Sequence, residues 1–438
     1  MRASVLIVSL LAALSSARAA ETLTGAAAFG DWRSDAPGVS RLIRPGDVPP
    51  ATTRTSASSA RVVARPKEML PKVPDGYAIA PLAEGLDGAR TLRFAPDGTL
   101  FVAQTSRGVI TALRLSADGA NVVERKAFAS GMDGPFGLGF YPPGPDPKWF
   151  YVATTTSVMR FPYKRGDLVA SGKPELLVSD LPDGGHSTRD LVFSRDGTRM
   201  FVSVGSASNV GEDMGARPKD LAAFEASHGM GASWGDEEGR AAVLVFDPDG
   251  RNRKVFANGL RNCVGMSLAP ASDRLWCATN ERDLMGDDLP PDYATEVREG
   301  AFYGWPWFYI GANVDRRPGT RPDLAGKVSV PDVLIQAHSA PLGIAFNEGG
   351  QFPAGGRDDA FVALHGSWNR AKRTGYKIVR LPFRDGKPTG AYEDFVTGFV
   401  LDDQRVWGRP VSLTGAPDGS LLFSEDGNGS VWRVTATR

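Results

Sequence analysis

Three of the four histidines in the chain, His186, His338 and His365, lie at the ends of short segments rich in β-forming residues. Histidine exchanges a proton near neutral pH, and arginine binds a carboxylate through two parallel hydrogen bonds. Residues of these types that meet in space could bind an anionic ligand and move a proton, or they could form a hydrated ring of mutual ion pairs. The concentration of histidines favours a site. Other polar residues at equivalent segment ends are Arg90, Gln104, Arg189, Ser206, Asn209, Arg261, Asn262, Asn280, Glu281, Arg409, Glu425 and Asp426.

These residues flank six copies of one sequence plan: a β-rich strand, a turn often written P-D-G or R-D-G, and a second β-rich strand. In an antiparallel hairpin the start of the first strand and the end of the second lie at the same end, so six hairpins would collect the polar residues at one mouth. Four-stranded sheets repeated radially make a β-propeller. We therefore predict an all-β fold, a six-bladed β-propeller with four-stranded antiparallel blades, over residues 76–438; a two-sheet sandwich is the alternative. The copies begin at Thr91, Phe136, Arg189, Val264, Leu342 and Val411.

The N-terminal residues predict export. Arg2 precedes the apolar run Val5 to Leu14, and Ala17-Arg18-Ala19 has the pattern of a cleavage site. Residues 1–19 are therefore a predicted signal peptide, and the mature protein is expected in the periplasm or outside the cell; an uncleaved anchor is the alternative. No later segment offers about 18 consecutive apolar residues, so we predict no membrane span. Residues 20–75, rich in Pro, Ser and Thr, predict an irregular N-terminal arm.

Charge and motif content exclude several classes of partner and reaction. The 50 Lys and Arg residues balance the 50 Asp and Glu residues, so no net field marks the chain for nucleic acid or an anionic membrane surface. The sequence lacks the GxGxxG, Walker, HExxH, CxxC and GxSxG motifs. Nicotinamide, ATP, zinc-protease and α/β-hydrolase chemistry are therefore disfavoured.

The two cysteines, Cys263 and Cys277, flank a segment that is predicted to form a hairpin. If the hairpin turns near Ser272, the cysteines are offset by about three residues at ~3.3 Å each, which is too far for a disulfide. We therefore expect the two cysteines to be unpaired. A turn centred on Pro270 would instead permit a bridge.

Five strings in series resemble those of one protein family. They are GGHSTRDLVFSRDGTRMFVSVGS, GLRNCVG, NERDLMGDDLPPDY with EGAFYGWP, HSAPLGIAF, and LHGSWNR. From about residue 75 to the C-terminus the chain resembles the soluble sugar dehydrogenases that depend on pyrroloquinoline quinone (PQQ), the glucose/sorbosone dehydrogenase family, and in particular its L-sorbosone dehydrogenase-like branch. The resemblance implies a propeller that holds PQQ and Ca²⁺ over the channel mouth. It also implies hydride transfer from an aldose or sugar aldehyde to the quinone, and a periplasmic electron acceptor, either cytochrome c or a quinone.

The resemblance assigns roles to particular residues. His186 of GGHSTRD matches the general base of the family, and Arg261 and Asn262 of GLRN match a cofactor-contacting pair. Arg409 resembles a cofactor-binding arginine. The family also places a cation against the quinone near LHGSWNR, where the candidates are Arg370, Lys372 and Arg373.

The resemblance also implies a metal site. The family binds calcium through main-chain oxygens after the strand that here ends at Asn280, which points to Arg282 and Asp283. The side chains of Glu281 and Asp287 are predicted to contribute around the cofactor, and Asp287 is also a predicted metal ligand. Oxygen ligands suit Ca²⁺. The alternative is that this segment is only an acidic loop.

Two positions depart from the family pattern. Ser206 stands where glucose-oxidising members have an aspartate that orients the base, so either Asp190 or another carboxylate takes that role, or the base is tuned less strongly. Cys263 stands where the sorbosone-like branch has proline, which weakens any inference about the substrate from the glucose enzymes.

Two other classes of function compete with the dehydrogenase. A calcium-dependent lactone hydrolase on a propeller would need carboxylates from several blades on one ion, and a noncatalytic propeller would bind a glycan or a protein. Three tryptophans are candidates for stacking on a sugar ring or, alternatively, for packing between blades: Trp305, Trp307 and Trp368.

Overall fold

The computed structural model describes residues 21–437, apart from residues 55, 271, 349–350 and 353–357. The predicted signal peptide, residues 1–19, lies outside the described residues. Strands dominate, and the one α-helix in this part of the chain is α1 (Leu221–His228). No helix among the described residues has the length and apolar character needed to cross a membrane.

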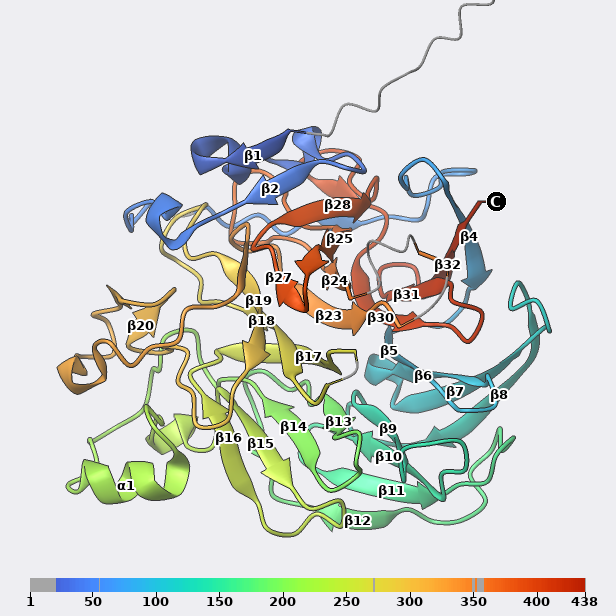
Figure 1. Ribbon diagram of the computed structural model, residues 1–438, viewed down its shortest axis with the longest axis horizontal. Helices are drawn as coiled ribbons and strands as arrows, with labels where there is room; N and C mark the ends of the chain where they lie inside the picture. Colours follow the sequence, from blue (N-terminus) through green and yellow to red (C-terminus); the bar gives the residue numbers. More distant parts are fainter. Residues whose placement is uncertain (1–20, 55, 271, 349–350, 353–357, 438) are drawn as a thin grey trace, which may run out of the picture.

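Six blades, each with four antiparallel strands, are arranged around a central axis (Figure 1), which confirms the predicted six-bladed β-propeller. Blade 1 contains β5 (Ala89–Phe94), β6 (Leu100–Gln104), β7 (Val109–Leu115) and β8 (Val122–Ser130). Blade 2 contains β9 (Leu138–Tyr141), β10 (Trp149–Ala153), β11 (Val158–Pro162) and β12 (Glu175–Val178). Blade 3 contains β13 (Leu191–Phe193), β14 (Met200–Val204), β15 (Ala242–Phe246) and β16 (Lys254–Asn258).

Blade 4 contains β17 (Asn262–Leu268), β18 (Leu275–Asn280), β19 (Asp292–Val297) and β22 (Val333–Ile335). Blade 5 contains β23 (Pro341–Phe346), β24 (Ala360–Leu364), β25 (Lys377–Leu381) and β28 (Tyr392–Val396). Blade 6 contains β30 (Pro410–Gly415), β31 (Leu421–Glu425), β32 (Ser430–Ala436) and β4 (Tyr77–Ala83). Because β4 comes from the N-terminal part of the chain and pairs with the C-terminal β32, the two ends of the propeller close the ring together.

The six predicted hairpins are the first two strands of the six blades, and glycines in or directly before three of the first strands explain part of the repeat. A Cβ atom added to Gly265 of β17 would lie 2.5 Å from the main-chain oxygen of Leu342 in the next blade. The same atom on Gly137 would lie 2.6 Å from Arg189 O, and on Gly343 2.5 Å from Val411 O. The first strands of adjacent blades can therefore meet only where a side chain is absent.

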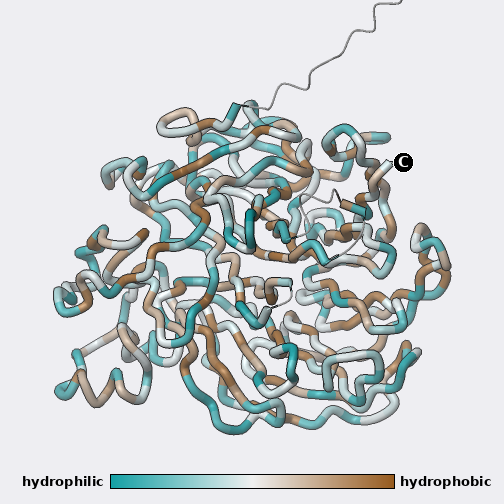
Figure 2. Tube along the Cα trace, viewed as in Figure 1, coloured by the Kyte–Doolittle hydropathy of each residue, from teal (hydrophilic) through white to brown (hydrophobic). Residues whose placement is uncertain are grey.

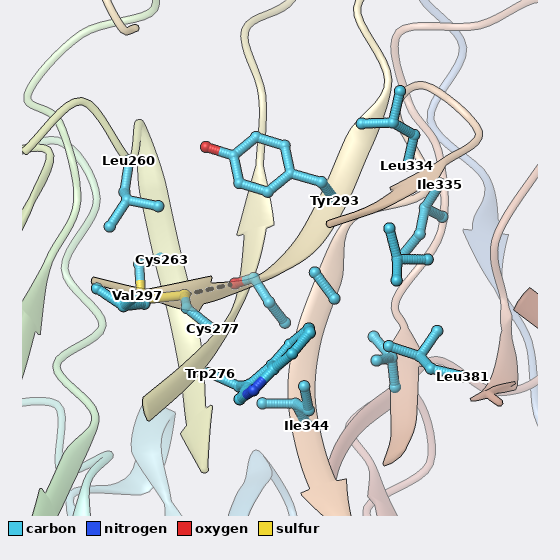
Figure 3. Close-up of a cluster of buried hydrophobic side chains, with 14 of the residues drawn as sticks. Leu260, Cys263, Trp276, Cys277, Tyr293, Val297, Leu334, Ile335, Ile344 and Leu381 are labelled. Atoms are coloured by element: carbon cyan, nitrogen blue, oxygen red, sulfur yellow. Dashed lines mark hydrogen bonds between the residues drawn. A yellow bond between two sulfur atoms is a disulfide. The ribbon is translucent and has the colours of Figure 1, made fainter. Parts of the chain in front are cut away.

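The hydrophobic core lies between neighbouring blades, and apolar stretches follow the blade strands (Figure 2). The fully buried Trp276 of blade 4 has its ring centroid 5.9 Å from that of Phe346 and 5.2 Å from that of Phe383. Ile344 and Leu381 of blade 5 lie beside it (Figure 3). Side chains from two blades thus form one cluster, which holds the blades in register.

The N-terminal arm contains strands, although its sequence predicts irregular structure. β1 (Thr22–Thr24) pairs in parallel with β2 (Ser40–Leu42), which pairs with β28 and extends the sheet of blade 5 to six strands. β3 (Arg61–Val62) pairs in parallel with β29 (Arg405–Val406). These strands have two or three residues each, which is too few for the alternating pattern of a strand to be recognised in the sequence.

A buried ion cluster fastens the arm to blade 5. Arg41 of the arm contacts Asp35 at 2.9 Å and Asp394 of β28 at 3.0 Å. Lys377 of β25 contacts the same two carboxylates, each at 2.7 Å. All four side chains are buried, so the arm is part of the folded propeller rather than an appendage.

Two insertions pack together beside blades 3 and 4 at the periphery (Figure 1). One carries α1 and the other carries β20 (Phe308–Tyr309) and β21 (Asn313–Val314). Trp234 and Trp307 meet between them, with ring centroids 5.6 Å apart. The remaining short elements are β26 (Phe383–Arg384), β27 (Lys387–Pro388) and the 3₁₀ helices η1 (Gly25–Phe29), η2 (Trp32–Ser34), η3 (Pro45–Asp47), η4 (Thr105–Arg107), η5 (Gly235–Glu237) and η6 (Pro322–Leu324).

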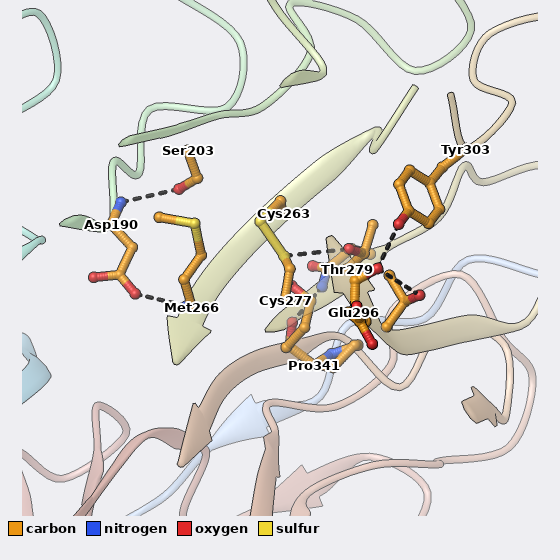
Figure 4. The surroundings of a disulfide bond; sticks show 12 residues. Asp190, Ser203, Cys263, Met266, Cys277, Thr279, Glu296, Tyr303 and Pro341 are labelled. Carbon is orange, nitrogen blue, oxygen red and sulfur yellow. Dashed lines mark hydrogen bonds between the residues drawn. A yellow bond between two sulfur atoms is a disulfide. The ribbon is translucent and has the colours of Figure 1, made fainter. Parts of the chain in front are cut away.

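Cys263 and Cys277 form a disulfide (Figure 4), so the expectation of unpaired cysteines is wrong. Cys263 pairs with Thr279, whereas Met266 pairs with Cys277, because a β-bulge lies between Cys263 and Gly265. The bulge reduces the offset between the cysteines, and their Cα atoms are 5.8 Å apart, within the range of a disulfide. A hairpin counted with uniform register cannot reveal such a bulge.

Candidate functional site

The strand register brings the polar segment ends together at one mouth of the propeller. Ala89 pairs with Gln104, Asn262 with Asn280, and Pro410 with Glu425. Each pair joins the start of a first strand to the end of a second strand. The hairpin geometry expected from the sequence therefore places residues of separate blades at the same end of the ring.

An apolar cluster lies where the first strands of four blades begin. It consists of Phe136, Val264, Leu342 and Val411, at or beside the starts of four first strands. Beyond it the first strands line a cavity of about 640 Å³ that reaches hairpin-turn residues such as Arg195 and Pro417. Asp190 lines this cavity, whereas none of the predicted catalytic, cofactor-binding or metal-binding residues does, so the candidate site is the polar mouth and not the channel.

His186 lies in the loop before β13, and the main chain of Ser206 orients it. Its Nδ1 lies 2.8 Å from the carbonyl oxygen of Ser206 and 3.1 Å from Ser206 Oγ, which donates its own proton to Ser208 O. Because a carbonyl only accepts hydrogen bonds, Nδ1 carries the proton and Nε2 is left with its lone pair. Within the described residues Nε2 makes no hydrogen bond. Burial, followed by the charge of Arg261, lowers the pKa of His186 to about 4, so the imidazole is neutral at pH 7 and able to accept a proton.

Asp190 does not orient His186, which leaves the alternative of a base that is tuned less strongly. Its carboxylate accepts hydrogen bonds from the backbone N–H groups of Leu191 at 2.8 Å and Met266 at 2.7 Å, and its own N–H donates to Ser203 (Figure 4). Burial raises the pKa of Asp190. This carboxylate joins blade 3 to blade 4 beneath the site, and the base is oriented by a neutral group instead.

Gly205 allows His186 and Asn262 to lie side by side. A Cβ atom at position 205 would lie 2.4 Å from Asn262 Oδ1 and 2.6 Å from His186 Cβ. Asn262 Oδ1 is buried and has no hydrogen-bond partner among the described residues. A buried acceptor without a donor is costly in a folded protein and points to a ligand that supplies one.

Arg261 is held by three hydrogen bonds to the mouth loops. Its Nε donates to Asn209 O at 3.2 Å, Nη1 donates to Glu281 O at 2.9 Å, and Nη2 donates to Asn209 Oδ1 at 3.2 Å. Asp283 Oδ2 lies 3.6 Å from Nη2. The structure thus brings together the predicted residues Arg261, Glu281 and Asp283.

A second cationic group gathers around Asp426. Arg90 and Arg409 contact its carboxylate at 3.0 Å and 2.9 Å, and His365 Nε2 lies 3.0 Å from it. Burial opposes ionisation of Asp426, but His365 and the two arginines hold its pKa below the usual range. Two arginines share one carboxylate, so an excess of positive charge remains. Of these residues only Arg409 was predicted as a site residue; the position of Arg90, His365 and Asp426 at segment ends was the available signal.

Glu281, predicted to contact the cofactor, is buried with Oε1 unpartnered among the described residues. Burial raises its pKa to about 8, so the carboxyl is protonated at neutral pH. A protonated carboxyl donates as well as accepts a hydrogen bond. The side chain can therefore meet an anionic ligand without repelling it.

Two of the predicted calcium ligands, Asp283 O and Asp287, do not fit a metal in this arrangement. Asp283 O accepts hydrogen bonds from Arg282 Nε at 2.9 Å, Arg282 Nη2 at 2.7 Å and Asn209 Nδ2 at 3.2 Å. These donors use the lone pairs of the oxygen, and the guanidinium brings positive charge where a cation would bind. Asp287 is also engaged, because its Oδ2 accepts from Ala371 N at 2.9 Å. In the described part of the chain no group of three or more His, Cys, Asp or Glu side chains is placed to hold a metal.

Arg282 itself pairs with the buried Asp315 of the second insertion, and His338 contacts the Asp283 carboxylate at 3.3 Å. His338 Nε2 lies 2.9 Å from Gly286 O. Burial lowers the pKa of His338, but its hydrogen bonds to Asp283 and Gly286 outweigh burial and raise it overall. The loop after β18 is thus stabilised from both sides by charged groups of the protein.

The three candidates near LHGSWNR have different surroundings. Arg370 donates to Asp287 O at 3.0 Å and to Phe29 O at 3.2 Å, which ties the loop after β18 to the arm. Arg373 is buried and donates to Ser367 O, whereas Lys372 pairs with Asp403 at the surface. A contact between Arg370 and the cofactor stays a prediction.

The three candidate tryptophans also differ in their surroundings. Trp305 and Trp307 are 2% and 1% exposed, which identifies them as packing residues. Trp368 is 45% exposed and follows β24 at the mouth end of blade 5. Only Trp368 has a free face that a sugar could stack against.

Known proteins match more than half of the chain. An uncharacterized protein of Borreliella burgdorferi is 34% identical over 255 residues, which are 57% of this chain and 60% of that protein. The pyrroloquinoline quinone-dependent pyranose dehydrogenase of Coprinopsis cinerea is 25% identical over 430 residues, with 83% of this chain and 54% of that protein covered. The chain therefore spans little more than half the length of these curated relatives.

Solved structures share the fold. The holo form of the pyranose dehydrogenase PQQ domain from Coprinopsis cinerea matches with a TM-score of 0.67 and 22% identity, over 85% of this chain and 98% of that domain. The sequence pattern of the TrAA12-like family matches residues 71–291 and 320–437, which is well over half of the chain. The chain therefore belongs to the TrAA12-like family.

Proposed function

We propose that this protein is a PQQ-dependent sugar dehydrogenase that oxidises an aldose or a sugar aldehyde, with His186 as the general base. The observation that carries the proposal is the unengaged Nε2 of His186 beside Arg261 and the unpartnered Asn262 Oδ1. Membership in the TrAA12-like family and the PQQ-dependent relative support it. Side chains cannot accept a hydride, so the reaction needs a cofactor of this kind.

The residues of the mouth fit PQQ. The quinone carries three carboxylates, and arginine is the side chain best suited to bind them. Arg261 and Arg409 would hold carboxylates, Asn262 Oδ1 would accept a hydrogen bond, and the protonated Glu281 would add no negative charge. When bound, PQQ supplies the two-electron acceptor.

His186 would take the proton of the substrate hydroxyl as the hydride leaves the same carbon, which converts the alcohol to a carbonyl group. The Nδ1–H bond to Ser206 O holds the ring with Nε2 available. Geometry thus provides the base in its neutral form, and the depressed pKa keeps it neutral over a wide pH range.

Finer parts of the proposal rest on the sequence resemblance. They are an L-sorbosone-like substrate, passage of electrons to a periplasmic cytochrome c or quinone, and export by the predicted signal peptide. Ca²⁺ belongs to the same group, and its predicted donor at Asp283 is already engaged. The lactone hydrolase alternative needs carboxylates of several blades on one ion, and the described residues offer no such group.

Reconstitution tests the proposal. Purified apo-protein is titrated with PQQ while absorbance is followed, and dye reduction is then measured across a panel of aldoses and sugar aldehydes. His186→Gln is compared with His228→Gln, a control on α1 outside the mouth. We expect the His186 variant to bind PQQ and lose at least a hundredfold in kcat, and the control to match wild type. No PQQ binding and no turnover with any sugar would overturn the function, and full activity of His186→Gln would overturn the role of the base.

A further inference from the structure

We propose that Asn209 is a positioning residue that holds the Arg261 guanidinium in the orientation that binds the anionic quinone. This inference rests on the proposed function. Asn209 lies in the loop after β14, and its side chain hydrogen-bonds directly to Arg261 and to the backbone of Asp283.

The amide of Asn209 pairs with the backbone of Asp283 on both sides. Its Oδ1 accepts from Asp283 N at 2.8 Å, and its Nδ2 donates to Asp283 O at 3.2 Å. A primary amide can do both at once, as a peptide group does in a strand, whereas a carboxylate can only accept. The loop of blade 3 is thereby joined to the loop after β18 of blade 4.

Asn209 also provides two of the three acceptors that fix Arg261. Nε and Nη2 of Arg261 donate to O and Oδ1 of Asn209, and Nη1 donates to Glu281 O. A guanidinium has five N–H donors, so one remains on each terminal nitrogen. Two such parallel donors bind a carboxylate. Asn209 therefore determines which edge of Arg261 is left for a ligand.

The loop that carries Asn209 is itself anchored. Trp305 Nε1 donates to Asn209 O at 3.1 Å, and the buried Glu237 accepts from Ala207 N and Ser208 N, both at 2.8 Å. These contacts hold the backbone on which Asn209 stands. The amide can thus place Arg261 because its own position is determined independently of Arg261.

A link to His186 provides a measurement that needs no cofactor. The groups that act on the imidazole are the positive charges of Arg261 and Arg189, the carboxylate of Asp283 and the Ser206 carbonyl. Arg261 is the charge that lowers the His186 pKa most after burial. If Arg261 leaves its position, the His186 imidazole should titrate at higher pH.

The experiment compares Asn209→Ala and Asn209→Asp with wild type. The control is Asn313→Ala, which removes an amide that donates to Ile310 O at 3.0 Å in the second insertion. Three quantities are measured on each protein: the Kd for PQQ, the His186 titration midpoint of the apo-protein by NMR, and Tm. We expect both Asn209 variants to raise Kd at least tenfold, and Asn209→Ala to move the midpoint upward by at least half a pH unit. Asn313→Ala should leave Kd and the midpoint unchanged.

The outcomes separate the two proposals. Unchanged Kd and midpoint in both Asn209 variants, even with a lower Tm, would show that Asn209 is only structural and would overturn the inference. If wild type binds no PQQ, the proposed function fails, and the apo-protein midpoint still decides whether Asn209 positions Arg261. If Asn209→Ala does not fold, the nearly isosteric Asn209→Asp decides by its Kd.

Discussion

At the scale of the residue, the orientation of His186 by a main-chain carbonyl has a chemical consequence. The Ser206 carbonyl fixes the tautomer but carries no negative charge to stabilise the imidazolium, and Arg261 and burial act against protonation. A carboxylate in the same place would orient the ring and raise its pKa. The side chain at position 206 therefore controls the pKa of His186 more than the orientation of its ring.

Ser206→Asp should raise the pKa of His186. In wild type the acid limb of the kcat/KM profile is expected near pH 4, because activity is lost only when the imidazole is protonated. The new carboxylate stabilises the imidazolium, so the limb should move to higher pH by about 1 unit. pH–rate profiles of the reconstituted enzyme measure this. Ser206→Ala keeps the carbonyl and should leave the limb in place; a limb that stays near pH 4 in Ser206→Asp would contradict the argument.

At the scale of the element, the loop after β18 and the N-terminal arm are stabilised by cations of the chain itself. Arg282 engages Asp283 O, and Arg370 joins the same loop to the arm. Arg41 and Lys377 neutralise two buried carboxylates where the arm meets blade 5. The loop after β18 and the N-terminal arm, whose sequences show no strand or helix periodicity, are thus held in place by specific charge contacts.

Adding Ca²⁺ to the apo-protein should leave Tm unchanged. A ligand that binds only the folded state raises Tm, and the predicted donor Asp283 O is engaged by Arg282. Differential scanning calorimetry with millimolar Ca²⁺, with Mg²⁺ as the control ion, measures this. A saturable rise of Tm specific to Ca²⁺ would show that Arg282 gives way to the metal.

Arg41→Met should destabilise the protein strongly. Removal of one cation leaves a buried carboxylate of Asp35 or Asp394 short of its partner, which costs about 3–5 kcal/mol in the free energy of unfolding. Chemical denaturation measures the loss. Arg33→Met is the matched control in the same arm, because the Arg33 side chain is 49% exposed, and its Tm should equal that of wild type. Equal stability of the two variants would mean that the buried cluster does not fasten the arm.

At the scale of the whole molecule, the closed ring sets how near the blades can approach. The first strands meet at glycines, and β4 completes blade 6 from the far end of the chain. The paired segment ends of blades 1, 4 and 6 then lie at the same end of their hairpins. The distance between blades is therefore a property of the ring as a whole, and the site depends on it.

Gly265→Ala should disturb this packing. The added Cβ would lie 2.5 Å from Leu342 O, which belongs to a backbone that cannot move alone, so we expect a loss of about 1–3 kcal/mol in the free energy of unfolding. Gly415→Ala in β30 is the control, because nothing lies within 4 Å of its added Cβ. Denaturant unfolding of both variants measures the difference. A variant Gly265→Ala as stable as the control would show that the blades are free to separate.

The repeated hairpins could be read from the sequence because strand alternation and turn residues are local signals. The same reading placed His186, Arg261 and Asn262 at one mouth, since an antiparallel hairpin determines which ends meet. The strands of the arm could not be predicted from the sequence because they have two or three residues and form only by pairing with blade 5 and with β29. The disulfide could not be predicted because a single β-bulge changes the register of the hairpin that carries the two cysteines.

The sequence by itself thus determined the number of blades, the hairpin formed by the first two strands of each blade, and the residue types that gather at the mouth. Only the tertiary structure decided which of those residues touch: Ser206 O rather than Asp190 at His186, Arg282 on Asp283 O, and Asn209 between Arg261 and Asp283. The physical reason is that hydropathy and turn signals act over a few neighbouring residues. Hydrogen bonds and charges between loops of different blades depend on distances that exist only after the ring has closed.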